Sequence, residues 1–232
     1  MHSQQHQLPL EVQLRDDATL ANFLAAPAVQ PLIAALQRQL QPAGEPMIYC
    51  YGPTGSGKSH LLQASCHLAG SAALYLPLAE MAQFAPEDVL HGVDALGLVC
   101  LDDVDRVLHS AAWELALFNL FNRARQRDCR LLVAGAAAPR ALSMDLADLR
   151  SRLSWGIVYQ LAQPDDSAKA DILRFRASQR GLLLSAEVSN YLSNHAPRDL
   201  GQMLQLLDVL DRASLTEQRA LSVPFVKQTL GW

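Results

Sequence analysis

Hydrophobic positions along this chain follow two patterns, short continuous runs and a helical period, which alternate from the first strand to the last. The short runs predict five strands, at residues 47–51, 73–76, 98–101, 130–134 and 157–161. Helical periodicity is clearest at 110–127, where Trp113, Leu117 and Phe121 fall on one face and Ser110 can cap the helix. Strands that alternate with helices predict an α/β fold with a parallel sheet covered by helices.

The pattern changes after Pro164, where the strand signal stops. Four helices are predicted in this part of the chain, at residues 165–180, 185–195, 199–215 and 223–230. Gly181 is suited to end the first of them, because glycine readily takes the left-handed conformation that follows many helices. We expect the boundary to separate an α/β domain, residues 19–163, from an all-helical domain, residues 164–232.

The amino-terminal region has a weaker pattern. Residues 1–18 are polar, rich in glutamine and without a sustained period, which favours a flexible, extended tail. From residue 19 to residue 41 the apolar positions indicate two helical pieces, which we expect to be broken around Pro27 and Pro31.

Composition limits the classes of function. The 232 residues, half of them apolar, suffice for one α/β domain and a small second domain. The net charge of −4 argues against a protein that binds mainly to the backbone of DNA or RNA. Four arginines near the end of the helix at 110–127 leave a local basic patch open, but we favour basic side chains that complement the carboxyl end of a helix. They are Arg123, Arg125, Arg127 and Arg130.

The cysteines and the hydropathy profile indicate a cytoplasmic protein. The four cysteines are far apart and form no C-x-x-C, so neither a zinc site nor a redox pair is suggested. The amino terminus has no apolar segment typical of a signal peptide, and no apolar stretch approaches membrane-spanning length. We therefore expect a soluble protein with no membrane partner.

The clearest chemistry lies between the first strand and the helix that follows it. Residues 52–59 read G-P-T-G-S-G-K-S, the pattern of a phosphate-binding loop. Glycines let backbone N–H groups turn toward phosphate oxygens at a helix amino terminus, Lys58 can reach the β- and γ-phosphates, and the Ser59 hydroxyl can ligate magnesium. The flanking strand and helix disfavour the alternative, a glycine-rich turn without a ligand. The predicted nucleotide-binding residues are Gly52, Pro53, Thr54, Gly55, Ser56, Gly57, Lys58, Ser59 and His60.

The strand at 98–101 is followed directly by two acids, Asp102 and Asp103. Such a strand beside a phosphate loop places a carboxylate near the magnesium shell, and the next acid can orient or deprotonate a water. We predict Asp102 and Ser59 as ligands of Mg²⁺ and Asp103 as a catalytic residue. The alternative is a pair of strand-end acids that caps the next turn.

Two further segments are Ser-Arg-Leu-Ser-Trp-Gly at 151–156 and Ala-Pro-Arg-Asp-Leu at 196–200. Together with the phosphate loop and the Leu-Asp-Asp segment, they resemble the AAA+ P-loop ATPase family, and within it the bacterial replication initiator DnaA. The resemblance runs from about residue 19 to the end. It implies a parallel five-stranded sheet with flanking helices plus a carboxyl-terminal helical lid, Arg152 as an arginine finger, and Arg198 as a sensor II contact to nucleotide. The alternative for Arg152 is a salt bridge to a nearby acid such as Asp148.

DnaA itself is longer and carries a carboxyl-terminal helix-turn-helix domain, whereas this sequence stops at Trp232. It is therefore similar to the shorter DnaA-related proteins that inactivate the initiator. That resemblance implies ADP or ATP with Mg²⁺ as the bound group, an arginine finger supplied in trans that stimulates ATP hydrolysis on DnaA, and prevention of re-initiation of chromosomal replication. A homo-oligomer, a dimer, is also expected. Residues 133–138 offer no polar sensor I side chain, so we expect weak intrinsic ATPase activity.

Three other functions stay open. The first alternative is an autonomous AAA+ ATPase such as a helicase loader, which works by its own hydrolysis cycle. A small P-loop phosphotransferase is disfavoured by the segment at 151–156 and by the helical lid. The third alternative is a binding adaptor in which the nucleotide only stabilises the fold.

The tail carries a separate motif. Residues 5–10, Gln-His-Gln-Leu-Pro-Leu, are similar to the Q-x-x-L-P-L peptide with which replication proteins bind the β sliding clamp of DNA polymerase III. Leu8 and Leu10 can enter an apolar pocket, Pro9 restricts the unbound tail, and the Gln5 amide can hydrogen-bond at the rim. Six residues are easily matched by chance, but their position in a tail ahead of a DnaA-like domain favours clamp binding. DNA would then be contacted only indirectly, through the clamp.

Overall fold

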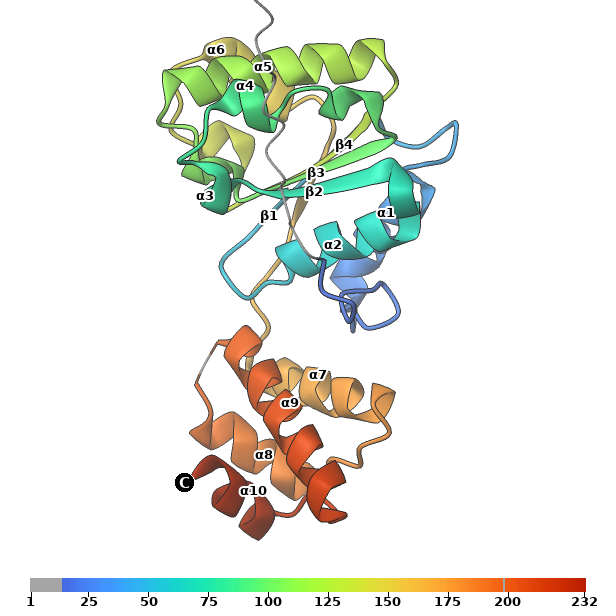
Figure 1. The fold of residues 1–232 in the computed structure, drawn as a ribbon, viewed down its shortest axis with the longest axis vertical. Coiled ribbons are helices and arrows are strands. Elements are labelled where there is room, and N and C mark those ends of the chain that lie inside the picture. Colours follow the sequence, from blue (N-terminus) through green and yellow to red (C-terminus); the bar gives the residue numbers. More distant parts are fainter. Residues whose placement is uncertain (1–13, 198) are drawn as a thin grey trace, which may run out of the picture. The chain divides into compact units, whose positions relative to one another are not determined.

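The chain divides into two compact units, one that ends at Ala162 and one that runs from Gln163 to Trp232 (Figure 1). The computed structural model describes residues 14–197 and 199–232. Five residues of the predicted sites therefore lie outside the described residues: Gln5, Leu8, Pro9, Leu10 and Arg198.

A parallel sheet of five strands forms the centre of the first unit. Its strand order is β2-β3-β4-β1-β5. The strands are β1 (Met47–Tyr51), β2 (Ala73–Pro77), β3 (Leu98–Asp102), β4 (Arg130–Gly135) and β5 (Ile157–Gln160). All pairings are parallel, as predicted, so the carboxyl ends of the strands share one edge of the sheet.

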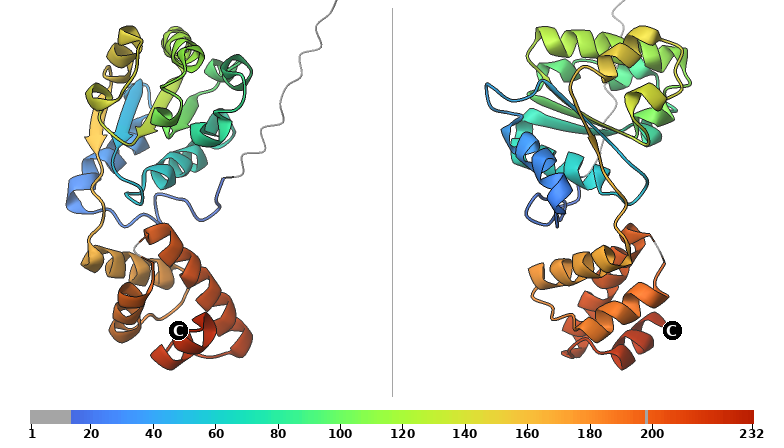
Figure 2. Two further views of the ribbon diagram at one scale, coloured as in Figure 1. Left: turned by 90° about the vertical axis from the view of Figure 1, so that its left-hand side faces the viewer. Right: turned by 180° about the vertical axis from the view of Figure 1, so that it is seen from behind.

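Helices cover both faces of this sheet (Figures 1 and 2). Residues of β1 alternate between the two faces, as expected for extended backbone. Met47 and Tyr49 pack in the core that contains α5, whereas Ile48 and Cys50 pack in the core that contains α1 and α2. The helices of this unit are α1 (Gln30–Arg38), α2 (Lys58–Ala69), α3 (Leu78–Met81), α4 (Pro86–Val89), α5 (Ala111–Gln126) and α6 (Ala147–Leu153). Short 3₁₀ turns are η1 (Pro27–Val29), η2 (Gly70–Ala72), η3 (Val93–Ala95), η4 (Val104–Arg106) and η5 (Pro139–Ala141).

The first of the two helical pieces predicted between residues 19 and 41 is wrong. Residues 19–26 form turns and extended backbone, and the Thr19 hydroxyl accepts a hydrogen bond from the backbone N–H of Asn22 at 3.2 Å. Pro27 and Pro31 do not break a helix but stand in the first turns of η1 and α1, where the missing N–H of proline costs nothing.

Four helices form the second unit: α7 (Asp166–Gln179), α8 (Ala186–His195), α9 (Leu200–Glu217) and α10 (Val223–Leu230). Each begins after an Asp or Ser whose side chain accepts a hydrogen bond from a backbone N–H three residues later. Such caps stabilise a helix by about 1 kcal/mol each. Phe225 and Leu210 lie fully buried in the core between the helices. Within the described residues, none of the helices combines the length and the apolar character that crossing a bilayer would require.

A buried ion pair ties η3 to α5 in the first unit. The Asp94 side chain is 2% exposed and lies 3.0 Å from Arg123 and 2.9 Å from Arg127. Burial alone would raise the pKa of Asp94, but the hydrogen bond from Arg123 and the charges of both arginines hold that pKa below its ordinary value. Arg123 and Arg127 therefore bind this carboxylate, in addition to lying at the end of a helix, and Arg130 of the same cluster lies 4.0 Å from Asp128.

Replacing Asp94 with asparagine should lower the free energy of unfolding at pH 7 by about 1–3 kcal/mol, because two arginines lose their charged partner. A carboxyl group with a lowered pKa stabilises the fold above its unfolded pKa and loses that contribution as the pH falls through the folded pKa. The difference in the free energy of unfolding between the parent and Asp94→Asn should therefore become smaller below about pH 4. Urea unfolding across this range measures it. Asp128→Asn is the control: this side chain is 93% exposed, and an equal loss there would contradict the assignment.

Candidate functional site

The phosphate loop connects the carboxyl end of β1 to the first residue of α2. Its path requires glycine, since Gly55 has φ 80° and Gly57 has φ 94°, in the left-handed region that side chains disfavour. A side chain at Gly57 would also meet the ring of Phe23 at 2.7 Å. The backbone conformation of the loop therefore requires two of the glycines from which the loop was predicted.

The interior of the loop fits a phosphate group. The Lys58 side chain is buried, and its amino group donates to the carbonyls of Gly52 at 2.7 Å and Pro53 at 3.1 Å. The Ser56 hydroxyl is buried and has no hydrogen-bond partner among the described residues. An unpaired buried hydroxyl is costly, so it calls for a ligand or water. A cation, an unpaired donor and a helix amino terminus together suit an anionic group.

Asp102 ends β3 and is held from two sides. Its Oδ2 accepts a hydrogen bond from the Tyr75 hydroxyl at 2.7 Å, and its Oδ1 accepts one from the Asp103 N–H at 3.0 Å. Burial raises the pKa of Tyr75, and the charge of Asp102 raises it further, while the neighbouring polar side chains of Gln63 and Ser59 act in the opposite direction. Tyr75 therefore stands within reach of both residues predicted to hold magnesium. Sequence reasoning missed it, because one tyrosine in an apolar strand carries no chemical signal.

Asp103 adopts a left-handed backbone conformation, with φ 53°. Burial raises the pKa of its carboxyl group, and the charges of Asp102 and Asp105 raise it further, against the lowering effect of Lys58 and Arg106. The alternative role, a cap for the next turn, is not seen for Asp103, which makes no side-chain cap at η4. The predicted catalytic acid thus lies in an acidic cluster within electrostatic reach of the loop lysine.

No polar sensor side chain stands at the end of β4, where instead the backbone of the next residues is hydrogen-bonded to two side chains. The Tyr49 hydroxyl donates to the carbonyl of Ala137 at 2.9 Å, and the Ala136 N–H donates to Asp105 at 2.8 Å. A side chain at Gly135 would meet the Tyr49 oxygen at 2.3 Å, so tyrosine fills the space under this strand.

Residues 14–23 lie along α2 beside the phosphate loop. The His60 ring nitrogen Nε2 is 2.8 Å from the Thr19 carbonyl oxygen, and the His60 and Phe23 rings are 5.5 Å apart. One helical turn further on, the Arg15 N–H donates to Gln63 at 2.9 Å. His60, predicted to contact nucleotide, is thus held by this segment. The apolar residues of the segment had indicated a helix, which concealed Phe23 as a wall of the loop.

Arg152 lies on α6, and aromatic rings hold its guanidinium. The Cζ atom of Arg152 is 4.4 Å from the centroid of Trp155 and 5.6 Å from that of Phe118. Within the described part of the chain Arg152 makes no ion pair, so the salt bridge to Asp148 that was the alternative is not formed. A cation–π contact holds a guanidinium in place without neutralising its charge.

A buried carboxylate fixes the amino end of α6. Glu114, 2% exposed on α5, accepts hydrogen bonds from the N–H groups of Asp145 and Leu146, the shortest at 2.7 Å. These donors precede the first turn of α6, where a negative charge is stabilising. Glu114 therefore sets the position of the helix that carries Arg152. Nothing local in the sequence indicated this role, because the partners are separated by 31 and 32 residues.

Arg152 and the phosphate loop lie at opposite ends of β1. Trp155 precedes Gly156, and a side chain at Gly156 would meet the carbonyl of Met47, the first residue of β1, at 2.0 Å. The loop instead follows Tyr51, the last residue of β1. A strand of this length spans roughly 13 Å at about 3.3 Å per residue. The aromatic stack of Arg152 is thus remote from the nucleotide loop of its own unit.

Comparisons with known proteins agree with this architecture. The family model described as Hda, lid domain, matches residues 166–230. An uncharacterized protein of Haemophilus influenzae is 41% identical over 228 residues, which cover 97% of this chain and 98% of that protein. Domain III of the Thermotoga maritima replication initiation protein DnaA has a TM-score of 0.76 at 22% identity, with 94% of this chain and 98% of that chain covered. AMPPCP-bound DnaA from Aquifex aeolicus has a TM-score of 0.70 at 23% identity, with 85% and 66% covered. Because these identities are only 22% and 23%, the similarity to the two solved structures is evidence for the fold alone.

Replacing Asp103 with asparagine should raise the melting temperature at pH 7.5 by roughly 1–4 °C, because a like charge leaves the acidic cluster. A carboxyl group with a raised pKa stabilises the fold at low pH and loses that contribution as the pH rises through the folded pKa. The gain should therefore shrink as the pH is lowered toward about 4. Scanning calorimetry at several pH values measures it. Asp128→Asn is the matched control, since Asp128 is also left-handed, with φ 57°, but exposed; a gain that does not depend on pH would refute the explanation.

Proposed function

The chain is an Hda-like AAA+ protein that belongs to one family with its Haemophilus influenzae relative, and from this premise we propose that it regulates the replication initiator DnaA. It stimulates ATP hydrolysis on DnaA and so prevents re-initiation of chromosomal replication. The observation that carries the proposal is the state of Arg152. Its guanidinium has no carboxylate partner among the described residues, and its aromatic stack lies at the end of β1 remote from the phosphate loop.

The chemistry of an arginine finger explains how such a residue would act. Negative charge on the γ-phosphoryl oxygens of the partner's nucleotide is stabilised by a guanidinium, which contributes about 10³–10⁵ in rate in other NTPases. Arg152 is held by ring faces, which do not neutralise its charge. Its Nε atom is buried, so the terminal N–H groups of the guanidinium would be the donors to phosphate oxygens. The separation from its own loop favours action on a neighbouring molecule over action in cis.

The nucleotide site of this chain itself would hold ADP or ATP with Mg²⁺. Lys58 would bind the β- and γ-phosphates, Ser59 and Asp102 would be the magnesium ligands, and Arg198 would contact the nucleotide. Bound magnesium would neutralise charge on the phosphate oxygens. The similarity of fold to AMPPCP-bound DnaA supports nucleotide binding.

Intrinsic hydrolysis at this site should be weak. The Tyr75 hydroxyl already donates to Asp102, and the end of β4 offers no polar side chain to position a water. Asp103 remains the candidate to orient or deprotonate that water. The nucleotide then serves mainly to organise the fold that presents Arg152.

The tail would tether this activity to DNA. Gln5, Leu8, Pro9 and Leu10 would bind the β sliding clamp of DNA polymerase III in the cytoplasm, and a dimer of the chain is a further expectation. A net charge of −4 suits an indirect contact with DNA through the clamp better than a direct one.

Arg152→Ala should reduce stimulated hydrolysis on DnaA by at least about 10³-fold while nucleotide and clamp binding stay unchanged, because only the γ-phosphate contact is lost. Phosphate released from DnaA–ATP in the presence of clamp-loaded DNA measures it. Arg38→Ala, an exposed arginine of α1 on the other face of the sheet, is the control.

Stimulation by Arg152→Ala equal to that of the parent would refute the finger assignment. The same assay without DnaA tests the alternative, an autonomous ATPase such as a helicase loader. Appreciable turnover by the purified protein alone, insensitive to Arg152→Ala, would favour that alternative.

Alanine at both Gln5 and Leu8 should abolish capture by immobilised clamp, because the rim hydrogen bond and the pocket side chain are removed together. The matched control is alanine at Gln4 and Gln7, two substitutions in the same segment that spare the motif. Undiminished capture of the first variant would remove the tail from the mechanism.

A further inference from the structure

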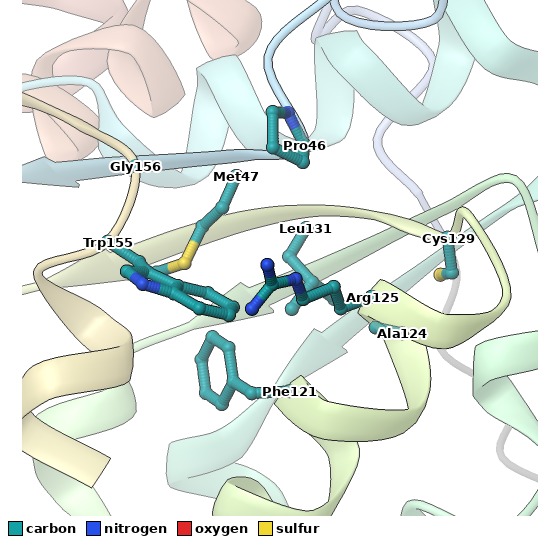
Figure 3. A pocket seen from close by; sticks show the side chains of 9 residues that line it. All are labelled: Pro46, Met47, Phe121, Ala124, Arg125, Cys129, Leu131, Trp155 and Gly156. Carbon is teal, nitrogen blue, oxygen red and sulfur yellow. The ribbon is translucent and has the colours of Figure 1, made fainter. Parts of the chain in front are cut away.

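A pocket of about 230 Å³ opens beside the Arg152 stack, at the amino ends of β1 and β4 (Figure 3). Its walls are carbon-rich: Met47, Phe121 and Leu131 line it together with Ala124 of α5. Trp155 stands at the mouth, with 45% of its surface exposed. Figure 3 shows Trp155, Arg125 and Phe121 pointing toward one another across this space.

Two guanidiniums stack on Trp155, which stands at the mouth of the pocket. The Cζ atom of Arg125 is 4.0 Å from the centroid of Trp155, on which Arg152 also stacks at 4.4 Å. Neither arginine forms an ion pair with any residue that the structure describes. By contrast, Arg123 on α5 and Arg127 directly after this helix both bind Asp94. The described residues therefore provide no carboxylate for the charge on these two arginines, although Asp94 pairs with arginines close by.

The size and polarity of the pocket select its occupant. Small-molecule and cofactor sites usually measure about 300–1,000 Å³, so this pocket suits one side chain better than a nucleotide. Its carbon-rich walls would leave the polar edges of a nucleobase unpaired, which is costly. A bulky apolar side chain carries no such cost. The free guanidinium of Arg125 would attract a carboxylate beside that side chain.

We propose that this pocket receives one bulky apolar side chain of the partner protein, from an acidic segment whose carboxylate binds Arg125. The inference rests on the proposed function, because the partner is the molecule whose nucleotide Arg152 reaches. The two arginines on Trp155 then have separate tasks: Arg125 binds the docking segment, and Arg152 is left for the phosphate. Exposed Trp and Arg at a pocket are typical of the residues that dominate binding at interfaces.

Arg125→Glu tests the docking step, since Arg125 is exposed and its replacement spares the core. We expect the affinity for ATP-bound DnaA on clamp-loaded DNA to fall at least tenfold. Arg38→Glu, a charge reversal on α1, should leave the affinity within about twofold. Arg152→Ala is measured by stimulation, which should be lost, and so reports on the finger rather than on the docking step. Ala124→Met enlarges a fully buried residue of the pocket wall without changing charge and should weaken binding like Arg125→Glu. Urea unfolding and nucleotide binding check that the larger side chain leaves the core folded.

The outcomes separate this inference from the proposed function. If Arg125→Glu and Ala124→Met bind DnaA like the parent while Arg152→Ala loses stimulation, the finger stands and the docking pocket is refuted. If Arg152→Ala stimulates hydrolysis on DnaA as well as the parent does, both the proposed function and the docking inference that rests on it are refuted. If the pocket variants change self-association instead of DnaA binding, the occupant is a second copy of this chain and the proposed partner is wrong.

Discussion

Strand β1 is the constraint on which both ends of the first unit depend. It is hydrogen-bonded to β4 on one side and β5 on the other, and its residues alternate between two buried cores. The chain before and after β5 passes so close that only glycine fits: a side chain at Gly156 would meet Met47 at 2.0 Å, and one at Gly52 would meet Leu161 at 2.2 Å. The phosphate loop and the Arg152 stack are therefore held at a fixed separation by one rigid strand.

The carboxylates and the arginines around Trp155 in this unit have different kinds of partner. Asp94 is paired with arginines, Glu114 with backbone N–H groups and Asp102 with Tyr75, so each buried carboxylate has partners that offset its desolvation. Arg152 and Arg125 instead rest on an aromatic ring. A ring orients a guanidinium but does not neutralise it, so these two charges remain available to another molecule. This contrast links the packing of the fold to the proposed action in trans.

The fold class and the order of elements followed from the sequence because they depend on local periodicity. The parallel five-stranded sheet, the helical second unit and the cap at Ser110 are confirmed. The helix expected near residues 19–24 was wrong, because the spacing of Leu20 and Phe23 fits a helical face and equally a looped segment packed on α2. The short helices α3 and α4 were not predicted, since four residues are too few to show a period.

The sequence by itself determined the phosphate loop and the two acids at the end of β3, because each is a contiguous motif whose chemistry depends on neighbouring residues. Only the tertiary structure decided what surrounds them. Tyr75 reaches Asp102 across 27 residues because β2 pairs with β3, and Glu114 reaches α6 across 31 or more because α5 and α6 pack together. Strand order and helix packing determine which arginines pair with a carboxylate and which stack on an aromatic ring. The spacing of these residues along the chain does not encode the pairing.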